Sequence, residues 1–164
     1  AIYDVLDKDG LKSILTLANQ QLERLDNEGK SNTQDLIKIM SALSTLLINS
    51  NEIIVDIGKK FTFYIQPFGS PLREFIEMIN NKLKMITFEI KKINEAESEL
   101  SILLHEKDES ISNDMWLRKF YEGMLAEAIV KSTGGNVQIH IDCRPNEEAT
   151  NTCVYHLKIN HLRN

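Results

Sequence analysis

The sequence lacks a long uncharged apolar run. No stretch approaches the length of about eighteen apolar residues that a helix needs to cross a bilayer. The N-terminus also lacks the basic-then-apolar pattern of a secretory signal. These two absences favour a cytoplasmic protein without a transmembrane segment.

An excess of positive charge is missing as well. Lys and Arg number 19 against 24 Asp and Glu, which gives a formal net charge of −5, and the two signs are interspersed. Proteins that bind nucleic acids present a basic stripe, because phosphate neutralisation supplies most of their affinity. We therefore expect no nucleic-acid partner.

The sequence contains none of the short motifs that mark common catalytic sites. A G-x-S-x-G elbow, an H-E-x-x-H pair, a phosphate-binding loop and a dinucleotide-binding G-x-G-x-x-G are all absent. Carboxylate pairs such as Glu147 and Glu148 fall in polar, turn-like segments, where solvated charges are the usual explanation. We expect a protein without enzymatic activity of its own.

Glycine, proline and cysteine are scarce, with 7, 3 and 2 residues, which excludes a fibrous or collagen-like chain. The 164 residues, 42% of them hydrophobic, can bury one core without stapling disulfides. We found no internal linker, repeat or low-complexity tract. The chain is therefore expected to form a single domain over residues 1–164.

Apolar residues at three- and four-residue steps predict four helices in the first half of the chain, at residues 9–29, 36–47, 53–65 and 70–83. Ser70 and Pro71 resemble an N-cap followed by a first-turn proline. A fifth helix is predicted at residues 117–129, before the glycine pair at 134–135.

Strict alternation predicts strands in the second half. Residues 86–91 and 99–104 form one predicted hairpin, and residues 137–143 and 153–159 form another. Alternating strands need a helical layer on their apolar face. The expected fold class is α+β, with two layers, in which helices pack on a four-stranded antiparallel sheet.

Two glycine-containing helical segments and the C-terminal cysteine hairpin suggest a family resemblance. The segments are Ile57-Gly58-Lys59-Lys60-Phe61 and Phe120-Tyr121-Glu122-Gly123-Met124-Leu125, and the hairpin contains Cys143 and Cys153-Val154-Tyr155. With this order of elements, residues 2–160 resemble the 4-vinyl reductase domain family.

The resemblance implies the fold of the small, Bet-type TRAPP subunits, a TRAPP-like or NO-signalling-type ligand-binding fold. It also implies a homodimer that holds a small apolar or aromatic molecule. Some sensor members of the family bind zinc through cysteines of the C-terminal hairpin and an acidic residue three positions before the first. His140 occupies that position here, and nine residues separate Cys143 from Cys153.

The cysteines admit three interpretations. If Cys143 paired with Cys153, His140 would lie opposite His156, with thiols and imidazoles on opposite faces of the sheet. A zinc site at Cys143, Cys153 and His140 would need a break in the pleat at Asp142 and a fourth ligand. The alternatives are buried thiols that act as small hydrophobes, or a disulfide. His140 and His156 are either a titrating pair or solvated strand residues.

The aromatic residues and methionines of the predicted helices supply adaptable apolar walls with a few polar tips, as small-molecule pockets do. The expected ligand-binding residues are Phe61, Trp116, Phe120, Tyr121 and Met124. A fully packed core is the alternative for these side chains.

From these features we expect a non-enzymatic small-molecule-binding or regulatory module. The alternatives are an interaction scaffold similar to a TRAPP small subunit, and an accessory protein of tetrapyrrole or aromatic metabolism. The apolar residues between Leu11 and Leu47 exceed what one sheet can bury, so we expect a homodimer through the first two helices.

Overall fold

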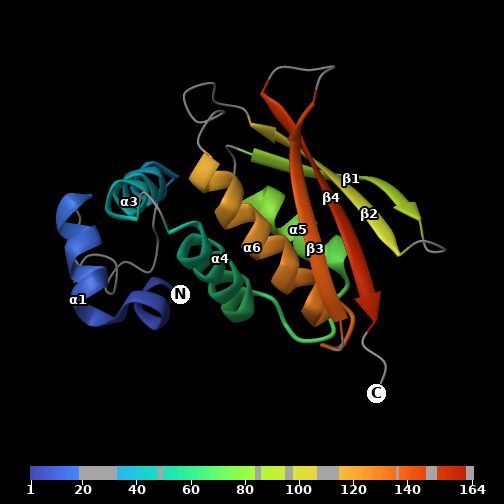
Figure 1. Ribbon diagram of the computed structural model, residues 1–164, viewed down its shortest axis with the longest axis horizontal. Helices are drawn as coiled ribbons and strands as arrows, with labels where there is room; N and C mark the ends of the chain where they lie inside the picture. The colour runs from blue at the N-terminus through green and yellow to red at the C-terminus, as the bar shows by residue number, and fades with distance from the viewer. Residues whose placement is uncertain are drawn as a thin grey trace.

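Four antiparallel strands form one sheet in the order β1-β2-β4-β3 in the computed structural model (Figure 1). The strands are β1 (Ile86–Asn94), β2 (Glu99–Glu106), β3 (Val137–Pro145) and β4 (Thr152–His161). The structure describes residues 1–18, 33–47, 50–83, 86–94, 98–106, 115–135, 137–146 and 151–161, with only the backbone at 33–37, 40 and 44.

The helices lie on one side of this sheet. They are α1 (Ile2–Leu17), α3 (Thr33–Leu46), α4 (Asn51–Ile65), α5 (Leu72–Lys82) and α6 (Met115–Ser132). Helix α6 packs on β3 and α5 on β1, α4 packs on α6, and α1 contacts both α3 and α4 (Figure 1). The expected α+β fold, with helices packed on a four-stranded antiparallel sheet, is confirmed.

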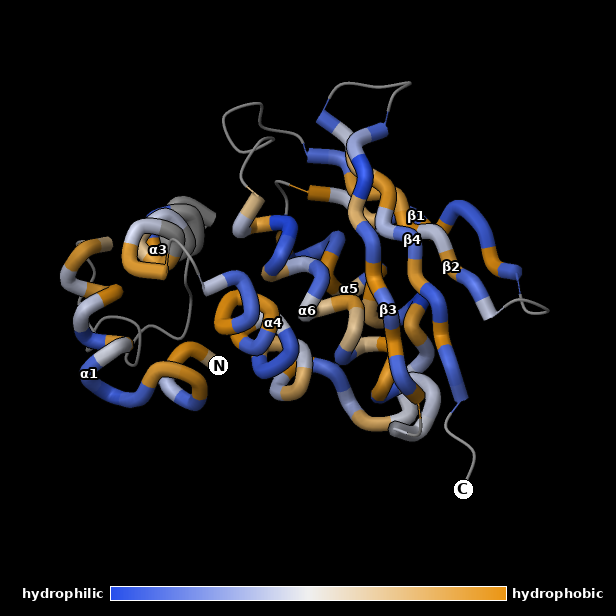
Figure 2. The backbone as a smooth tube through the Cα atoms, in the orientation of Figure 1, coloured by the Kyte–Doolittle hydropathy of each residue, from blue (hydrophilic) through white to orange (hydrophobic). Residues whose placement is uncertain are grey.

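The hydrophobic core lies between α6 and the helix-facing side of the sheet, and it continues among the buried residues of α1, α3 and α4. Hydrophobic and polar residues alternate along β3, as the pleat requires (Figure 2). From the other elements the core receives fully buried side chains such as Ile57, Ile102, Met124 and Tyr155. The side of the sheet that faces away from the helices is called the outer face below.

Helices α4 and α6 approach each other closely through two glycines. A Cβ atom on Gly58 would overlap the carbonyl oxygen of Phe120, and one on Gly123 would overlap that of Val55. Beyond this crossing, the Thr62 hydroxyl donates to the carbonyl of Met124 at 3.2 Å. Glycine is required at both positions because only its missing Cβ lets the two backbones meet.

The helices of the structure do not start where the sequence predicts, and the difference is largest in the first of them. Helix α1 starts at Ile2 rather than at residue 9 and is kinked at Asp7, where φ is 63°. The Asp7 carboxylate accepts hydrogen bonds from the backbone N–H of Asp9 and Gly10, at 2.9 and 3.0 Å, so it caps the second segment. Residues 19–29 of the predicted first helix lie outside the described residues.

The start of α5 lies one residue later than predicted. Pro71, not Ser70, occupies the N-cap position. The Ser70 hydroxyl donates instead to the carbonyl of Pro67 at 3.0 Å. Ser70 therefore stabilises the preceding turn rather than the helix.

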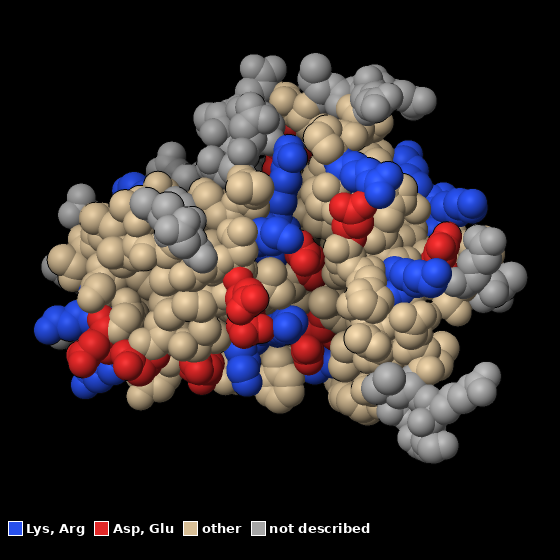
Figure 3. Space-filling view, viewed as in Figure 1, with Lys and Arg blue, Asp and Glu red and all other residues tan. Residues whose placement is uncertain are grey.

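Charge is mixed on the surface. On the face shown in Figure 3, Lys and Arg side chains lie among Asp and Glu side chains, without a large patch of one sign. None of the helices in the described ranges is long and apolar enough to span a membrane. The homodimer stays a prediction; Leu17 and Leu46, at the α1–α3 end, are each 49% exposed.

Candidate functional site

A β-bulge in β1 changes which residues face the helices. Ile86, Phe88 and Ile90 alternate inward, and Ile90 pairs with Ile102, but the register then shifts so that Lys92 pairs with Ser101. Ile93 consequently lies opposite the buried Leu100. Because a bulge inserts one residue into the alternation, Ile93 joins the helix-facing side instead of the outer face.

The bulge lies beside an open groove of about 380 Å³ at the end of the sheet near the start of α5. Its apolar residues come from α5 and three strands: Leu72, Ile90, Ile93, Leu100 and Ile159. We call this site the apolar groove. Ile93 is 58% exposed although it is an isoleucine on the helix-facing side. The volume lies within the range of small-molecule sites, about 300–1,000 Å³.

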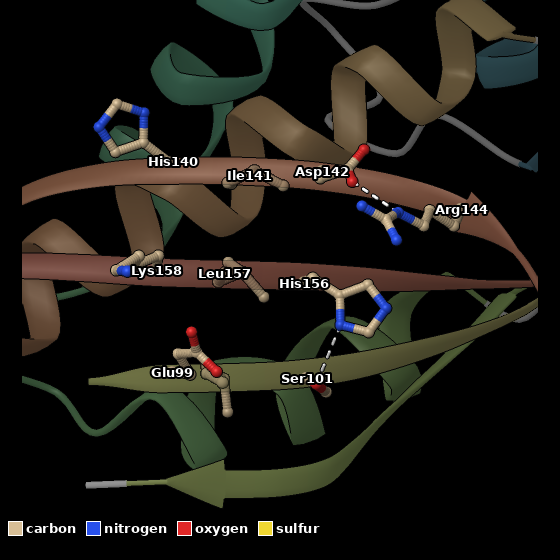
Figure 4. A pocket seen from close by; sticks show the side chains of 10 residues that line it. Glu99, Ser101, His140, Ile141, Asp142, Arg144, His156, Leu157 and Lys158 are labelled. Atoms are coloured by element: carbon tan, nitrogen blue, oxygen red, sulfur yellow. Dashed lines mark hydrogen bonds and ion pairs between the residues drawn. The ribbon is translucent and has the colours of Figure 1, made fainter. Parts of the chain in front are cut away.

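Two residues with nitrogen-containing side chains line the apolar groove and are exposed. They are Arg73, the second residue of α5, which is positively charged, and His161, the last residue of β4. Glu99 also borders the groove, but it pairs with Lys158 in the sheet register, and both lie at the outer face (Figure 4). The remaining polar lining residues, Asn94, Ser98 and Thr133, are uncharged.

The ligand-binding residues expected from the sequence lie elsewhere, between α4, α6 and the sheet. The ring centroids of Phe61 and Phe120 are 5.6 Å apart, and those of Phe120 and Tyr121 5.9 Å apart. Met124 is fully buried, and Trp116, near the start of α6, is partly buried against the core. The structure therefore brings these side chains into one packed cluster, and their contact with a ligand stays a prediction.

Sequence reasoning missed Ile93 as a candidate site residue. The predicted strand ended at residue 91, because two successive lysines interrupt the alternation after Ile90. An apolar residue three positions after the last alternating one was the available signal for a bulge.

The cysteines lie on adjacent strands but are not direct partners. Cys143 pairs with Tyr155, and Cys153 pairs with Pro145, so the register supposed from the sequence is wrong by two residues. Both thiols are free; Cys143 is half-buried and Cys153 buried. A hydrogen bond with Cys153 lowers the pKa of Cys143, and the Arg118 guanidinium adds to this effect. The same bond and burial raise the pKa of Cys153.

The expectation of zinc at Cys143, Cys153 and His140 is wrong. Among the described residues no group of three or more His, Cys, Asp or Glu side chains could hold a metal ion. His140 pairs with Lys158 and is exposed at the outer face, whereas both thiols face the helices. The pleat continues through Asp142, so the break that the site needed does not occur.

A second groove, of about 390 Å³, lies on the outer face (Figure 4). Here His156 lies between Ser101 and Asp142 on the neighbouring strands, and its Nδ1 is 3.4 Å from the Ser101 hydroxyl. The Asp142 carboxylate instead accepts a hydrogen bond from Arg144 Nε at 2.7 Å. Among the described residues no hydrogen bond joins Asp142 to His156, so the carboxylate does not orient the imidazole as it does in a catalytic triad.

Several solved structures share this arrangement of elements. The unliganded Fe(II) H-NOX protein from K. algicida matches with a TM-score of 0.60 and 15% identity, over 98% of this chain and 92% of that one. A mutant of T. tengcongensis H-NOX matches with a TM-score of 0.61 and 14% identity, over 99% of this chain and 93% of that one. The fold of this chain is similar to that of H-NOX domains. The oxygen complex of an oxygen-binding H-NOX domain related to soluble guanylate cyclases also matches. Its TM-score is 0.59 and its identity 14%, over 99% of this chain and 92% of that one.

The resemblance to the 4-vinyl reductase family is therefore corrected. The solved structures named above, which share the fold of this chain, are H-NOX domains. No protein-family model matches the sequence, and no curated protein matches it. The resemblance depended on the segments around Gly58 and Gly123, and the close helix crossing explains both glycines as a packing requirement. The scaffold and tetrapyrrole alternatives lose the support that they drew from it.

Haem distortion has been probed in another H-NOX structure with a similar fold, so we tested whether the residues of this chain fit a haem. Haem iron is held by His, Cys, Met or Tyr side chains. All four histidines are described, and none lies in the buried core: His105, His140 and His156 occupy outward positions, and His161 is exposed at the end of β4. Cys153, Tyr155 and Met124 are fully buried against other core side chains. The described residues therefore do not fit a haem in the core.

Proposed function

We propose that this protein is a non-enzymatic binding module that takes up a small apolar molecule in the apolar groove. The observation that carries the proposal is Ile93, which the bulge turns to the helix-facing side and leaves 58% exposed. Ile90, Ile159 and Leu72 beside it are half-buried. A ligand that covers these side chains removes apolar surface from water, which drives binding.

Two further observations support binding rather than catalysis. On the outer face, the Asp142 carboxylate contacts Arg144 and not His156, so Ser101, His156 and Asp142 do not form a hydrogen-bonded triad. Of the H-NOX structures with a similar fold, one is an oxygen-binding domain and another probes haem distortion. Because the core of this chain is filled, the proposal places its ligand at the edge of the sheet and does not include haem.

A thermal-shift titration with decan-1-ol, a neutral aliphatic probe, tests the proposal. A free ligand concentration near one hundred times the dissociation constant should raise the melting temperature by roughly 5–10 °C, because binding to the folded state alone stabilises it by mass action. Ile93→Ser removes apolar surface from the groove and should abolish the shift.

Leu17→Ser is the matched control, since Leu17 is 49% exposed on α1, outside the groove. It should leave the shift unchanged. The same experiment should be repeated by calorimetry, with folding of each variant checked by circular dichroism. No shift in the wild type, or an equal shift in Ile93→Ser, would overturn the proposal.

A further inference from the structure

We infer that the ligand of the apolar groove carries an anionic head group, of the carboxylate type, at the end of an aliphatic or aryl chain. This inference rests on the function proposed above and specifies its ligand class. Its basis is the position of Arg73, which follows Leu72 in α5 and lines the same groove as the exposed Ile93.

Arg73 is available for a ligand. Its side chain is exposed, and no residue in the described part of the chain forms an ion pair or hydrogen bond with its guanidinium. The next residue, Glu74, lies in the first turn of α5 but does not line the groove. The other arginines of the described ranges differ: Arg118 pairs with Glu106 and Arg144 with Asp142.

The charge around the groove favours an anion over a cation. Arg73 carries a positive charge on the groove, whereas the one acidic lining residue among those described, Glu99, lies opposite Lys158 at the outer face. A cationic amphiphile would therefore meet like charge at the rim. A neutral amphiphile would leave the guanidinium of Arg73 without a partner.

The chemistry of the guanidinium selects the head group. Its planar fork presents parallel N–H donors that match the two oxygens of a carboxylate. The apolar chain would lie along Ile93, Leu100 and Ile159, one from each of the three strands that line the groove. One molecule with an apolar body and one terminal carboxylate therefore satisfies both parts of the site.

Three probes with the same chain distinguish the possibilities: decanoate, decan-1-ol and decyltrimethylammonium, titrated by calorimetry at pH about 7.5. We expect decanoate to bind about tenfold more tightly than decan-1-ol, and the cation to bind more weakly than both. Arg73→Gln should remove the advantage of decanoate and leave decan-1-ol binding unchanged. Arg73→Lys should restore part of it, because Lys keeps the charge without the planar fork.

Lys12→Gln is the control for net charge, since Lys12 lies on α1 away from the groove. It should preserve the preference for decanoate. Equal binding of decanoate and decan-1-ol to the wild type would overturn the head-group inference and leave the proposed function intact. Failure of all three probes to bind would overturn the proposed function itself.

Discussion

Gly58 of α4 and Gly123 of α6 lie where the two helices cross, each against the backbone of the opposite helix. A side chain on Gly58 would meet Phe120 and one on Gly123 would meet Val55, in both cases at the carbonyl oxygen. The crossing is thus reciprocal. It fixes how deeply α4 can lie against the helix that covers the sheet.

The first prediction concerns these glycines. Gly123→Ala should lower the free energy of unfolding by about 1–3 kcal/mol, as overpacked cores do. Alanine favours the helix by about 1 kcal/mol, but no rotamer change can relieve an overlap between Cβ and a backbone carbonyl. Urea denaturation measures the difference. Glu127→Ala on the same helix should stay within about 0.5 kcal/mol of the wild type; an equally stable Gly123→Ala would show that the helices can separate freely.

Lys131 gives the second prediction. Its buried ammonium donates to the carbonyls of Phe63 and Gln66, the latter at 2.6 Å, at the C-terminal end of α4. Lys131→Met keeps the apolar stem but removes the donors, so we expect a loss of about 2–3 kcal/mol in unfolding free energy. Lys60→Met is the control, because Lys60 lies over the same Phe63 ring but is exposed. Equal effects of the two variants would contradict a specific role for Lys131.

The third prediction is a difference in thiol reactivity. Because hydrogen bonding with Cys153 lowers the pKa of Cys143, the reactive thiolate of Cys143 forms at a lower pH than that of an ordinary cysteine. Iodoacetamide should therefore alkylate Cys143 with a pH midpoint below that of glutathione, and the buried Cys153 should react only on unfolding. Peptide mass spectrometry assigns the sites.

Cys153→Ala removes the hydrogen-bond donor and should move the Cys143 midpoint upward. The pKa of Cys143 should rise in this variant because its thiolate loses a stabilising hydrogen bond, while its neutral thiol does not. A midpoint that does not move in this variant would show that the hydrogen bond has no effect on the thiol.

The fourth prediction concerns haem. Added hemin should not form a stoichiometric complex with the Soret band of a histidine-ligated iron, because no histidine of the described ranges lies in the core. Optical titration and native mass spectrometry check this. An equimolar complex that disappears in one of the His→Ala variants at 105, 140, 156 or 161 would show that this chain does ligate haem iron.

The helices and strands themselves were largely predictable. Helix α4, which includes Ile54 and Ile57, and β3, which includes Ile139 and Ile141, follow simple periods of 3.6 and 2 residues. These periods result from local backbone geometry combined with the need to bury one face. Helix ends were less predictable, because the cap at Asp7 depends on one pattern of side-chain hydrogen bonds rather than on a period.

The pairing of β3 with β4 shows where the pattern stops being informative. Alternation correctly placed Cys143 and Cys153 on one face and His140 and His156 on the other. It did not give the register, since a shift of two residues leaves every side chain on its original face. The polar residues between β3 and β4 gave no other indication of the register.

The sequence by itself determined the order of elements, the α+β class and the faces of the strand residues that alternate without interruption, because each depends on neighbouring residues along the chain. Only the tertiary structure decided that Ile93 lies on the helix-facing side, through a register shift against Leu100 and Ser101 of another strand. It also decided that Arg73 and Ile159, 86 positions apart in the sequence numbering (159 minus 73), line the same groove. Both facts depend on contacts between distant segments, which no local period encodes.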